Sequence, residues 1–470
     1  MATEVQQAAD VAGGDLGAGT LVEESPGPPA APSPAPRPLP VAGAERLGSV
    51  DVIRGVAVLG ILAMNIVGFA WPGNVYSVPI QAEGYGRADL LLWGFNHLVF
   101  DTKMMTLFSM LFGAGLVLMA DRAAGRGAKL GWVYYRRIGW LLAIGLVHSY
   151  LIWSGDILVL YASCGLVLYP ARRWSPRTLI ITGACLNLLA VPLWLGFRHA
   201  VVPYMKRTAE RVEARTKLGE KPQGWDAKVA EGYKQMTKEE MPKREDFLRQ
   251  VAVKRGSYVG IVRDRASGLI WSQTLGFLIG GWWYAGGRML IGMGLMKLGV
   301  FAARLSSRSY RLMMAVGYGV GLPLMLFEAI HESSHGFFLG RQFRHALEGW
   351  PLLTFYGSLP VVFGHIGLVM LVCRSGALPW LTRRLGAAGR MALSCYLFDS
   401  ICCTTLFYGY GFDLTATLHR PMLYAIVLAI WTAQLLACPL WLAAFRFGPA
   451  EWLWRSLTYW KPQPMRLRAA

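Results

Sequence analysis

Two pairs of polar side chains, each eleven residues apart, stand in long apolar segments and could do chemistry there. The first pair is Arg54 and Asn65, and the second is Arg137 and His148. Eleven residues of α-helix rise about 16 Å in close to three turns, so both members of a pair face the same way. Polar groups inside a bilayer are costly and usually mark a pathway or a reaction site. Each pair therefore predicts a membrane helix with a cation near one surface and a second polar group deeper in.

The second pair has a carboxylate nearby, because Asp156 follows His148 in the sequence Trp-Ser-Gly-Asp. A carboxylate beside an imidazole fixes its tautomer and raises its basicity, which predicts His148 as a general base oriented by Asp156. Asn65 would donate a hydrogen bond to a developing oxyanion. A structural interpretation stays open: His148 and Asn65 would bond neighbouring helices, and Asp156 would cap the next helix.

Cations at the ends of apolar segments are the candidates for binding an anionic ligand. Arg288 lies inside an apolar segment, where it either binds ligand phosphates or pairs with Asp399 or Glu328. The predicted ligand-binding set is Asp51, Arg54, Arg136, Arg137, Arg288 and Arg390.

Neither a metal site nor a disulfide framework is expected. None of the seven cysteines has C-x-x-C spacing. His331 to His335 matches the H-E-x-x-H pattern only formally, because Phe338 and Arg341 occupy the Gly and His positions of its extended form. The default interpretation is a polar loop with two histidines.

The composition predicts an all-α, polytopic transmembrane helix bundle. Of the 470 residues, 54% are hydrophobic and 16% charged, whereas a soluble protein carries about 25% charged residues. About ten spans are expected, at roughly 50–71, 102–120, 138–154, 157–171, 178–197, 268–296, 312–330, 351–373, 388–406 and 421–443.

The cations between these spans predict the orientation. The loops on one side hold twenty Lys and Arg, and the opposite short loops hold four, so both termini are expected in the cytoplasm. The net charge of +19 is thus spread over loops, and nucleic-acid binding, which needs one continuous basic face, is not expected.

Five regions are predicted along the chain. They are a disordered Pro/Ala-rich cytoplasmic tail (1–45), an N-terminal membrane half of about five spans (46–197), a charged extracytoplasmic insertion with amphipathic helices (198–267), a C-terminal membrane half (268–460) and a short tail (461–470).

Several stretches resemble the YeiB-like family of bacterial inner-membrane proteins, whose C-terminal half is domain of unknown function 418. They include residues 49–66, 108–115, 153–158, 389–397, 407–411 and 445–458. The first span is also similar to that of transmembrane acyltransferases of the heparan-glucosaminide N-acetyltransferase type, in which an Arg precedes a His or Asn by eleven residues. Those enzymes have a catalytic His after the first span; residues 66–88 contain none here, so we expect that role at His148.

The resemblance implies a multi-pass protein of the bacterial inner membrane that transfers an acyl group. The donor would be cytoplasmic acyl-CoA as co-substrate, and the acceptor a hydroxyl or amine of an envelope glycan or lipid outside. A transporter or flippase of the envelope and a noncatalytic membrane protein remain alternatives. The lipid bilayer is the one partner that composition itself requires, and the oligomeric state is open.

Overall fold

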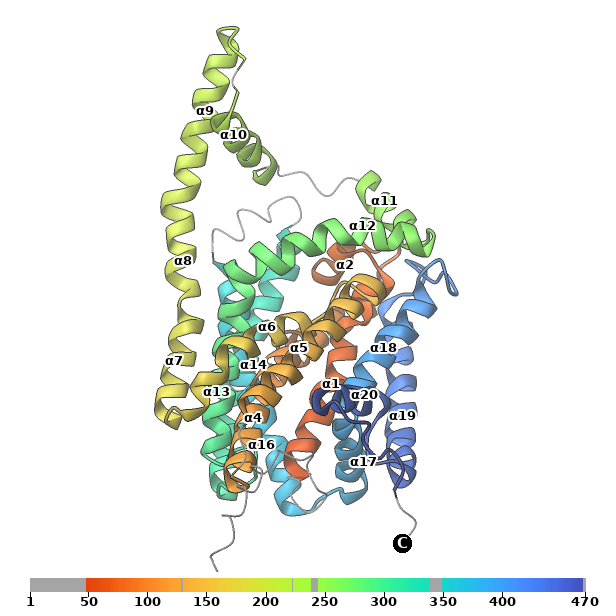
Figure 1. Ribbon diagram of the computed structural model, residues 1–470. Coiled ribbons are helices and arrows are strands. Elements are labelled where there is room, and N and C mark those ends of the chain that lie inside the picture. Colours follow the sequence, from red (N-terminus) through yellow and green to blue (C-terminus); the bar gives the residue numbers. More distant parts are fainter. Residues whose placement is uncertain (1–47, 128–129, 222, 238–243, 339–348, 468–470) are drawn as a thin grey trace, which may run out of the picture.

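The chain folds into a bundle of helices. The structure, a computed structural model, describes residues 48–127, 130–221, 223–237, 244–338 and 349–467 (Figure 1). The described part contains no β-strand, only an isolated antiparallel bridge between Phe445 and Arg466. The predicted tail 1–45 lies outside the described residues.

Helices form each of the three described regions that were predicted to be helical. The N-terminal half contains α1 Gly48–Ala70, α2 Gly73–Ser77, α3 Arg87–Val99, α4 Lys103–Gly125, α5 Gly131–Val147, α6 Leu158–Leu168, α7 Pro176–Leu188 and α8 Ala190–Gly196. The insertion contains α9 Val202–Lys217, α10 Trp225–Met236, α11 Arg244–Lys254 and α12 Tyr258–Trp271. The C-terminal half contains α13 Trp282–Lys297, α14 Ser307–Ser334, α16 Trp350–Ser375, α17 Pro379–Arg390, α18 Ala392–Phe407, α19 Arg420–Ala444 and α20 Pro449–Tyr459.

Shorter helical turns connect or extend these helices. The 3₁₀-helices are η2 Pro79–Gln81, η4 Tyr169–Arg173 and η7 Gly336–Phe338. The π-helices are η3 His148–Ile152, η5 Phe197–Val201 and η6 Ser272–Gly281. A π-helix is rare and frequently lies at a functional site, and η3 begins at His148.

The predicted all-α membrane bundle is confirmed, with a difference in span length. Six stretches of the described chain are long and apolar enough to cross a bilayer, namely Gly48–Ala70, Arg87–Gly125, Pro176–Lys217, Ser307–Ser334, Leu352–Ser375 and Arg420–Ala444. The four other predicted spans fall on shorter helices, α5, α6, α13 and α18. A helix of 16 residues, such as α18, is about 24 Å long and shorter than the 30 Å hydrocarbon core.

The bundle has two chemically different ends. Helix α1 begins at the same end of the bundle at which the C-terminus lies (Figure 1). The C-terminal ends of α4, α13, α16 and α19, each with an arginine close by in the sequence, lie at this end too, and we call it the basic end. Helices α2, α11 and α12 lie at the opposite end, called the far end below, and α9 and α10 project beyond it (Figure 1).

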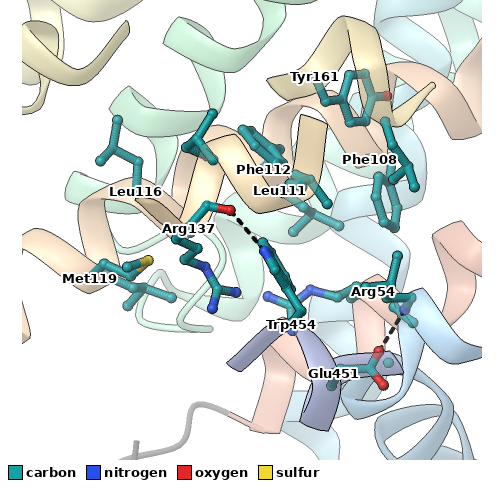
Figure 2. Close-up of a pocket in the computed structure, with 18 of the residues that line it drawn as sticks. Arg54, Phe108, Leu111, Phe112, Leu116, Met119, Arg137, Tyr161, Glu451 and Trp454 are labelled. Carbon is teal, nitrogen blue, oxygen red and sulfur yellow. Dashed lines mark hydrogen bonds between the residues drawn. The ribbon is translucent and has the colours of Figure 1, made fainter. Parts of the chain in front are cut away.

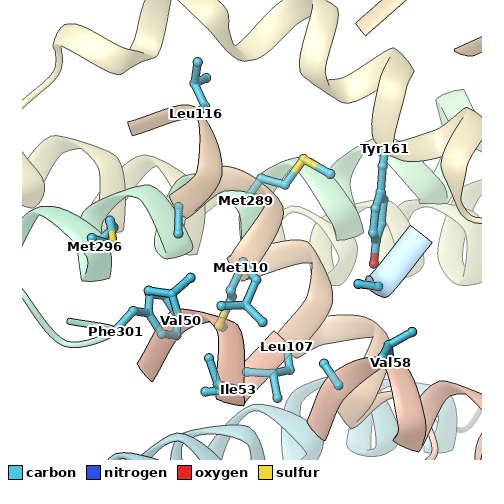
Figure 3. Close-up of a cluster of buried hydrophobic side chains, with 14 of the residues drawn as sticks. Val50, Ile53, Val58, Leu107, Met110, Leu116, Tyr161, Met289, Met296 and Phe301 are labelled. Carbon is cyan, nitrogen blue, oxygen red and sulfur yellow. The ribbon is translucent and has the colours of Figure 1, made fainter. Parts of the chain in front are cut away.

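Apolar side chains of α1, α4 and α13 form the centre of the largest core cluster (Figure 3). Met110 of α4 lies between Ile53 of α1 and Met289 of α13, and all three side chains are fully buried. A second cluster closes the far end, where the rings of Phe69 and Trp153 stack with centroids 4.0 Å apart. This packing fixes α1 and α4 as two walls of the site described below.

Glycines let α4 and α13 approach at backbone contact. A Cβ atom added to Gly113 would lie 2.0 Å from the Met289 carbonyl oxygen, and one added to Gly292 would lie 2.0 Å from that of Met110. Membrane helices associate largely through such close packing of small residues.

Gly292→Ala is therefore expected to lower the free energy of unfolding by at least about 1–3 kcal/mol, the usual cost of overpacking. Gly319→Ala is the matched control, because an added Cβ there meets nothing within 4 Å and alanine favours the helix by about 0.5–1 kcal/mol. Thermal unfolding of the detergent-solubilised variants measures both. Equal midpoints for the two variants would contradict the close packing of α4 and α13.

Candidate functional site

A cavity of about 280 Å³ opens at the basic end between α1, α4, α5, α6, α17, α18 and α20 (Figure 2). Arg54 of α1 and Arg137 of α5 lie on either side of Trp454 of α20. The first and third predicted spans, on α1 and α5, both line this cavity, which makes it the candidate for the predicted inner-surface site.

Cations dominate the mouth of the cavity. Its lining contains five arginines and two carboxylates: Arg54, Arg122, Arg137, Arg390 and Arg455, with Asp51 and Glu451. One carboxylate, that of Asp51, forms an ion pair with Arg54, with Oδ1 2.9 Å from Arg54 Nη1. The other carboxylate, that of Glu451, accepts hydrogen bonds at the start of α18, from Leu393 N at 2.7 Å and from Ser394 Oγ at 2.5 Å. The mouth therefore keeps a surplus of positive charge that suits an anion.

Helix α20 brings its Trp, Arg and Glu to the mouth from the end of the chain. The Trp454 indole Nε1 donates to the Arg137 carbonyl oxygen at 2.8 Å, and the Arg137 guanidinium lies 3.5 Å from the centroid of the Trp454 ring. Burial lowers the pKa of Arg455, and the neighbouring Arg54 and Arg122 act in the same direction. An anion that binds among guanidinium groups crowded in this way relieves their mutual repulsion and stabilises their charged forms.

Away from the mouth, the cavity wall becomes apolar and aromatic. Phe108, Leu111 and Phe112 of α4 face Tyr161 of α6 across the inner part of the cavity (Figure 2). The Tyr161 hydroxyl is satisfied, because it donates to the Met105 carbonyl oxygen at 2.8 Å and accepts from Ser109 Oγ at 2.8 Å. The cavity thus fits a ligand with an anionic head and an apolar extension.

A buried histidine–aspartate dyad lies behind this inner wall. His148 Nδ1 is 2.7 Å from Asp156 Oδ2, and each side chain is 1% exposed. Asp156 Oδ1 also accepts from the Val159 backbone N–H at 2.8 Å, so the carboxylate caps α6 as well. Since the carboxylate accepts, Nδ1 carries the proton in the neutral ring, and Nε2 is free to accept one. Nε2 is buried and has no hydrogen-bond partner among the described residues.

Tyr396 connects the dyad to the cavity. Tyr396 lines the cavity, and the centroid of its ring lies 5.0 Å from that of the His148 ring. Its hydroxyl oxygen accepts from the Ile157 backbone N–H at 3.4 Å, and Ile157 also lines the cavity. The imidazole is therefore one side chain away from the cavity space.

The chain is similar to known proteins over most of its length. The family model described as "Protein of unknown function (DUF418)" matches residues 295–461. "Uncharacterized protein YeiB" of Escherichia coli (strain K12) is 32% identical over 428 residues, which are 88% of this chain and 96% of the relative. "Uncharacterized protein YxaH" of Bacillus subtilis (strain 168) is 31% identical over 428 residues, which are 90% of this chain and 96% of the relative. The chain belongs to the YeiB-like DUF418 family.

The DUF418 region supplies only part of the site. It contributes Arg390, Tyr396, Glu451, Trp454 and Arg455, whereas α1, α4, α5 and the dyad precede it in the chain. The two relatives align over most of the chain, so their similarity extends well beyond the DUF418 region.

The structure does not bring Asn65 to the cavity wall. Its half-buried side chain makes no hydrogen bond within the described chain, and the α1 residues that line the cavity are Val50, Asp51 and Arg54. Asn65 precedes Gly68 by about one helical turn, so the two residues lie on the same side of α1. A Cβ atom added to Gly68 would lie 3.6 Å from Trp153 Cζ2. The amide therefore lies on the side of α1 that faces the segment between His148 and Asp156.

Two of the predicted ligand-binding arginines lie elsewhere. Arg136 is absent from the cavity wall, and its guanidinium lies 5.4 Å from the centroid of the Trp460 ring. Arg288 is fully buried behind α4 with its guanidinium 3.3 Å from the centroid of Tyr284, and its Nη2 donates to the Phe355 carbonyl oxygen at 3.1 Å. The predicted pairing of Arg288 is also corrected, since Asp399 accepts instead from Gln434 at 2.6 Å, and Glu328 bonds His97 and Thr354.

Sequence reasoning missed four groups of the site: Arg122, Tyr396, Trp454 and Arg455. Arg122 and Arg455 were counted only as orientation signals. The available signal for Trp454 and Arg455 was the alternation of apolar and charged residues over 449–459, which marks an amphipathic helix. Nothing in the chain order indicates that this helix packs against α5.

Another buried charge cluster lies outside the cavity, between α3, α4 and α14. His97 Nε2 is 3.2 Å from Glu328 Oε2, and His97 Nδ1 is 3.8 Å from Asp101 Oδ2. Lys103 Nζ donates to the His97 carbonyl oxygen at 2.5 Å. A carboxylate thus lies near each ring nitrogen of His97, and Lys103 lies beside the same ring-bearing residue. These pairs tie α3 and α4 to α14.

Proposed function

We propose that this protein is a membrane acyltransferase that moves an acyl group from cytoplasmic acyl-CoA to a hydroxyl or amine acceptor on the outer side of the bacterial inner membrane. The observation that carries the proposal is the His148–Asp156 dyad, with a bare Nε2, behind the inner wall of an arginine-lined cavity. The positive-inside rule supports a cytoplasmic basic end.

The cavity's chemistry supports acyl-CoA as the donor. Arg54, Arg137 and Arg455 at the mouth would bind the phosphates, since arginine forms strong, directional hydrogen bonds with phosphate oxygens. The apolar wall of Phe108, Leu111 and Phe112 would contact the pantetheine and acyl groups. The thioester would then point toward Tyr396 and the imidazole.

The reaction needs one base and one route for the proton. His148 Nε2 would remove the proton from the acceptor's O–H or N–H as the oxygen or nitrogen attacks the thioester carbonyl. The carbon–sulfur bond then breaks, and the imidazolium returns the proton to the coenzyme A thiolate. Asp156 would hold the ring and stabilise its charged form. Asn65 stays our candidate for the oxyanion, because it faces the segment that holds the dyad.

The test is turnover of acetyl-CoA by the purified protein in nanodiscs, with coenzyme A release followed by chromatography. Acetyl-CoA labelled in the acetyl group is then added to inner-membrane vesicles that contain the protein, and label is sought in lipid and glycan fractions. Coenzyme A release and label transfer above the level of His148→Gln protein are expected. Binding of acetyl-CoA without either would overturn the acyltransferase and favour a transporter or flippase, in which the same arginines bind a transported anion.

A further inference from the structure

The charged insertion ends in a segment that crosses the far end of the bundle. This segment, residues 254–273, is called the strap; it comprises the last residue of α11, the connection 255–257, all of α12 and the first two residues of η6. Helix α12 lies across the top of the bundle in Figure 1, whereas α9 and α10 project away from it. The strap is therefore the part of the insertion that contacts the bundle's far end most directly.

The start of the strap is anchored to two parts of the bundle. Lys254 Nζ donates to the carbonyl oxygens of Gly68 at 2.8 Å and Trp71 at 2.5 Å, at the end of α1. Gly409 N–H donates to the Lys254 carbonyl oxygen at 3.0 Å. A Cβ atom added to Gly409 would lie 1.9 Å from the Arg255 carbonyl oxygen, so a side chain at this position would displace the strap.

The rest of the strap contacts the π-helix that begins at His148. Tyr258 Oη donates to the Leu151 carbonyl oxygen at 3.0 Å. Arg265 Nη1 donates to the Tyr150 carbonyl oxygen at 3.4 Å. Gln273 Nε2 donates to Ser149 Oγ at 3.1 Å. Three donors of the strap thus bind the three consecutive residues that follow His148.

These contacts replace hydrogen bonds that the helix cannot make for itself. The last carbonyl groups of a helix have no partner within it. Here the π-helix closes with Trp153 N–H donating to the His148 carbonyl oxygen at 2.8 Å. The carbonyl oxygens of Tyr150 and Leu151 accept from the strap instead. The fully buried Ser149, next to the catalytic candidate, is bonded by Gln273.

We propose that Gln273, Arg265 and Tyr258 are positioning residues, which hold the π-helix so that His148 Nε2 faces the inner wall of the cavity. The strap is then a part of the reaction site, although its residues lie about a hundred positions after the dyad. This inference rests on the proposed function, in which His148 is the base.

The position of the contacts separates their effect from donor binding. The acyl-CoA phosphates would bind at the basic end, whereas the strap lies at the far end. A loosened π-helix would misplace the base while the arginines stay where they are. The expected kinetic result is a lower kcat at an unchanged KM for acetyl-CoA, because displacing a reacting group by about 1 Å can cost as much as 100-fold in rate.

The experiment compares Gln273→Leu and Tyr258→Phe with the control Thr274→Val. Thr274 is the neighbour of Gln273, and its exposed hydroxyl donates only within its own helix, to Ile270 and Trp271 carbonyl oxygens. Two readouts are taken: kcat and KM for acetyl-CoA, and the ring ¹⁵N resonances of His148 in protein labelled with [¹⁵N]histidine. The His148 signals are assigned by their loss in His148→Gln.

We expect kcat to fall about 10- to 100-fold in both strap variants with KM within twofold of wild type. The His148 ring resonances shift in the same two variants and stay in place in Thr274→Val. Unmoved ring resonances in both strap variants would overturn the positioning role, whatever the turnover. Shifted resonances in a protein that never turns over acetyl-CoA would keep the positioning of His148 and remove the proposed function.

Discussion

Replacing His148 by glutamine is expected to lower the turnover of acetyl-CoA by about 1,000-fold, within the range usual for loss of a general base. Glutamine keeps the size and polarity of the side chain but cannot accept a proton at neutral pH. The bare Nε2 of His148, buried and without a partner in the described chain, is the atom that this substitution removes. Binding of acetyl-CoA should stay within about twofold, because the arginines lie at the mouth of the cavity.

The measurement is coenzyme A release under single-turnover conditions, with binding followed by calorimetry. Asp156→Asn is the companion variant: the amide still accepts from Val159 N–H, but it no longer stabilises the imidazolium. Its rate should fall less than that of His148→Gln. His199→Gln is the control, since His199 is an exposed histidine of η5. Wild-type turnover in His148→Gln would assign the base to another group.

The long helices of this fold were predictable because a local pattern of apolar and charged residues marks each one. Apolar runs bounded by arginines located α1, α4, α14, α16 and α19 to within a few residues. Span length was less predictable, because α6 and α18 are shorter than a bilayer core. Neighbouring helices bury most of their side chains, although Phe398 and Ile401 of α18 stay exposed. No local pattern in the sequence reports this packing.

The site was predictable where its members share one stretch of chain. The proximity of His148 and Asp156 was inferred from eight residues of separation, and the structure has them 2.7 Å apart. Arg136 and Arg137 were not distinguished, because adjacent helix positions differ by about 100° and the sequence does not say which one faces the cavity. Arg288 lies outside the cavity, where aromatic rings and the Phe355 carbonyl surround it. The sequence pattern shows only that an arginine is buried and not what surrounds it.

Contacts over long sequence separation could not be predicted from one sequence. Trp454 meets Arg137 across 317 positions, and Gln273 meets Ser149 across 124. Both contacts connect the N-terminal half, which holds the dyad, to later parts of the chain. This division explains why the site spans more than the DUF418 region. It also explains why the contacts of the strap and of α20 could be identified only from the structure.

The second large effect is expected at the mouth of the cavity. Arg137→Met should weaken coenzyme A binding about 10- to 100-fold, because a hydrogen bond to a charged group is worth about 1.5–3 kcal/mol. The substitution keeps the Arg137 carbonyl oxygen that accepts from the Trp454 indole, so α20 retains its anchor. Methionine also keeps most of the apolar stem against the Trp454 ring.

The adjacent Arg136 gives a matched control of equal charge change. It lies on the same helix but outside the cavity wall, over Trp460, so Arg136→Met should bind coenzyme A within about twofold of wild type. Titration of coenzyme A at low and high NaCl separates contact from general attraction, because distant surface charges are screened by salt and close contacts much less so. The Arg137→Met deficit should persist at high salt. If both variants lost the same affinity, and only at low salt, the arginines would act as a diffuse positive surface and the cavity would not be the binding site.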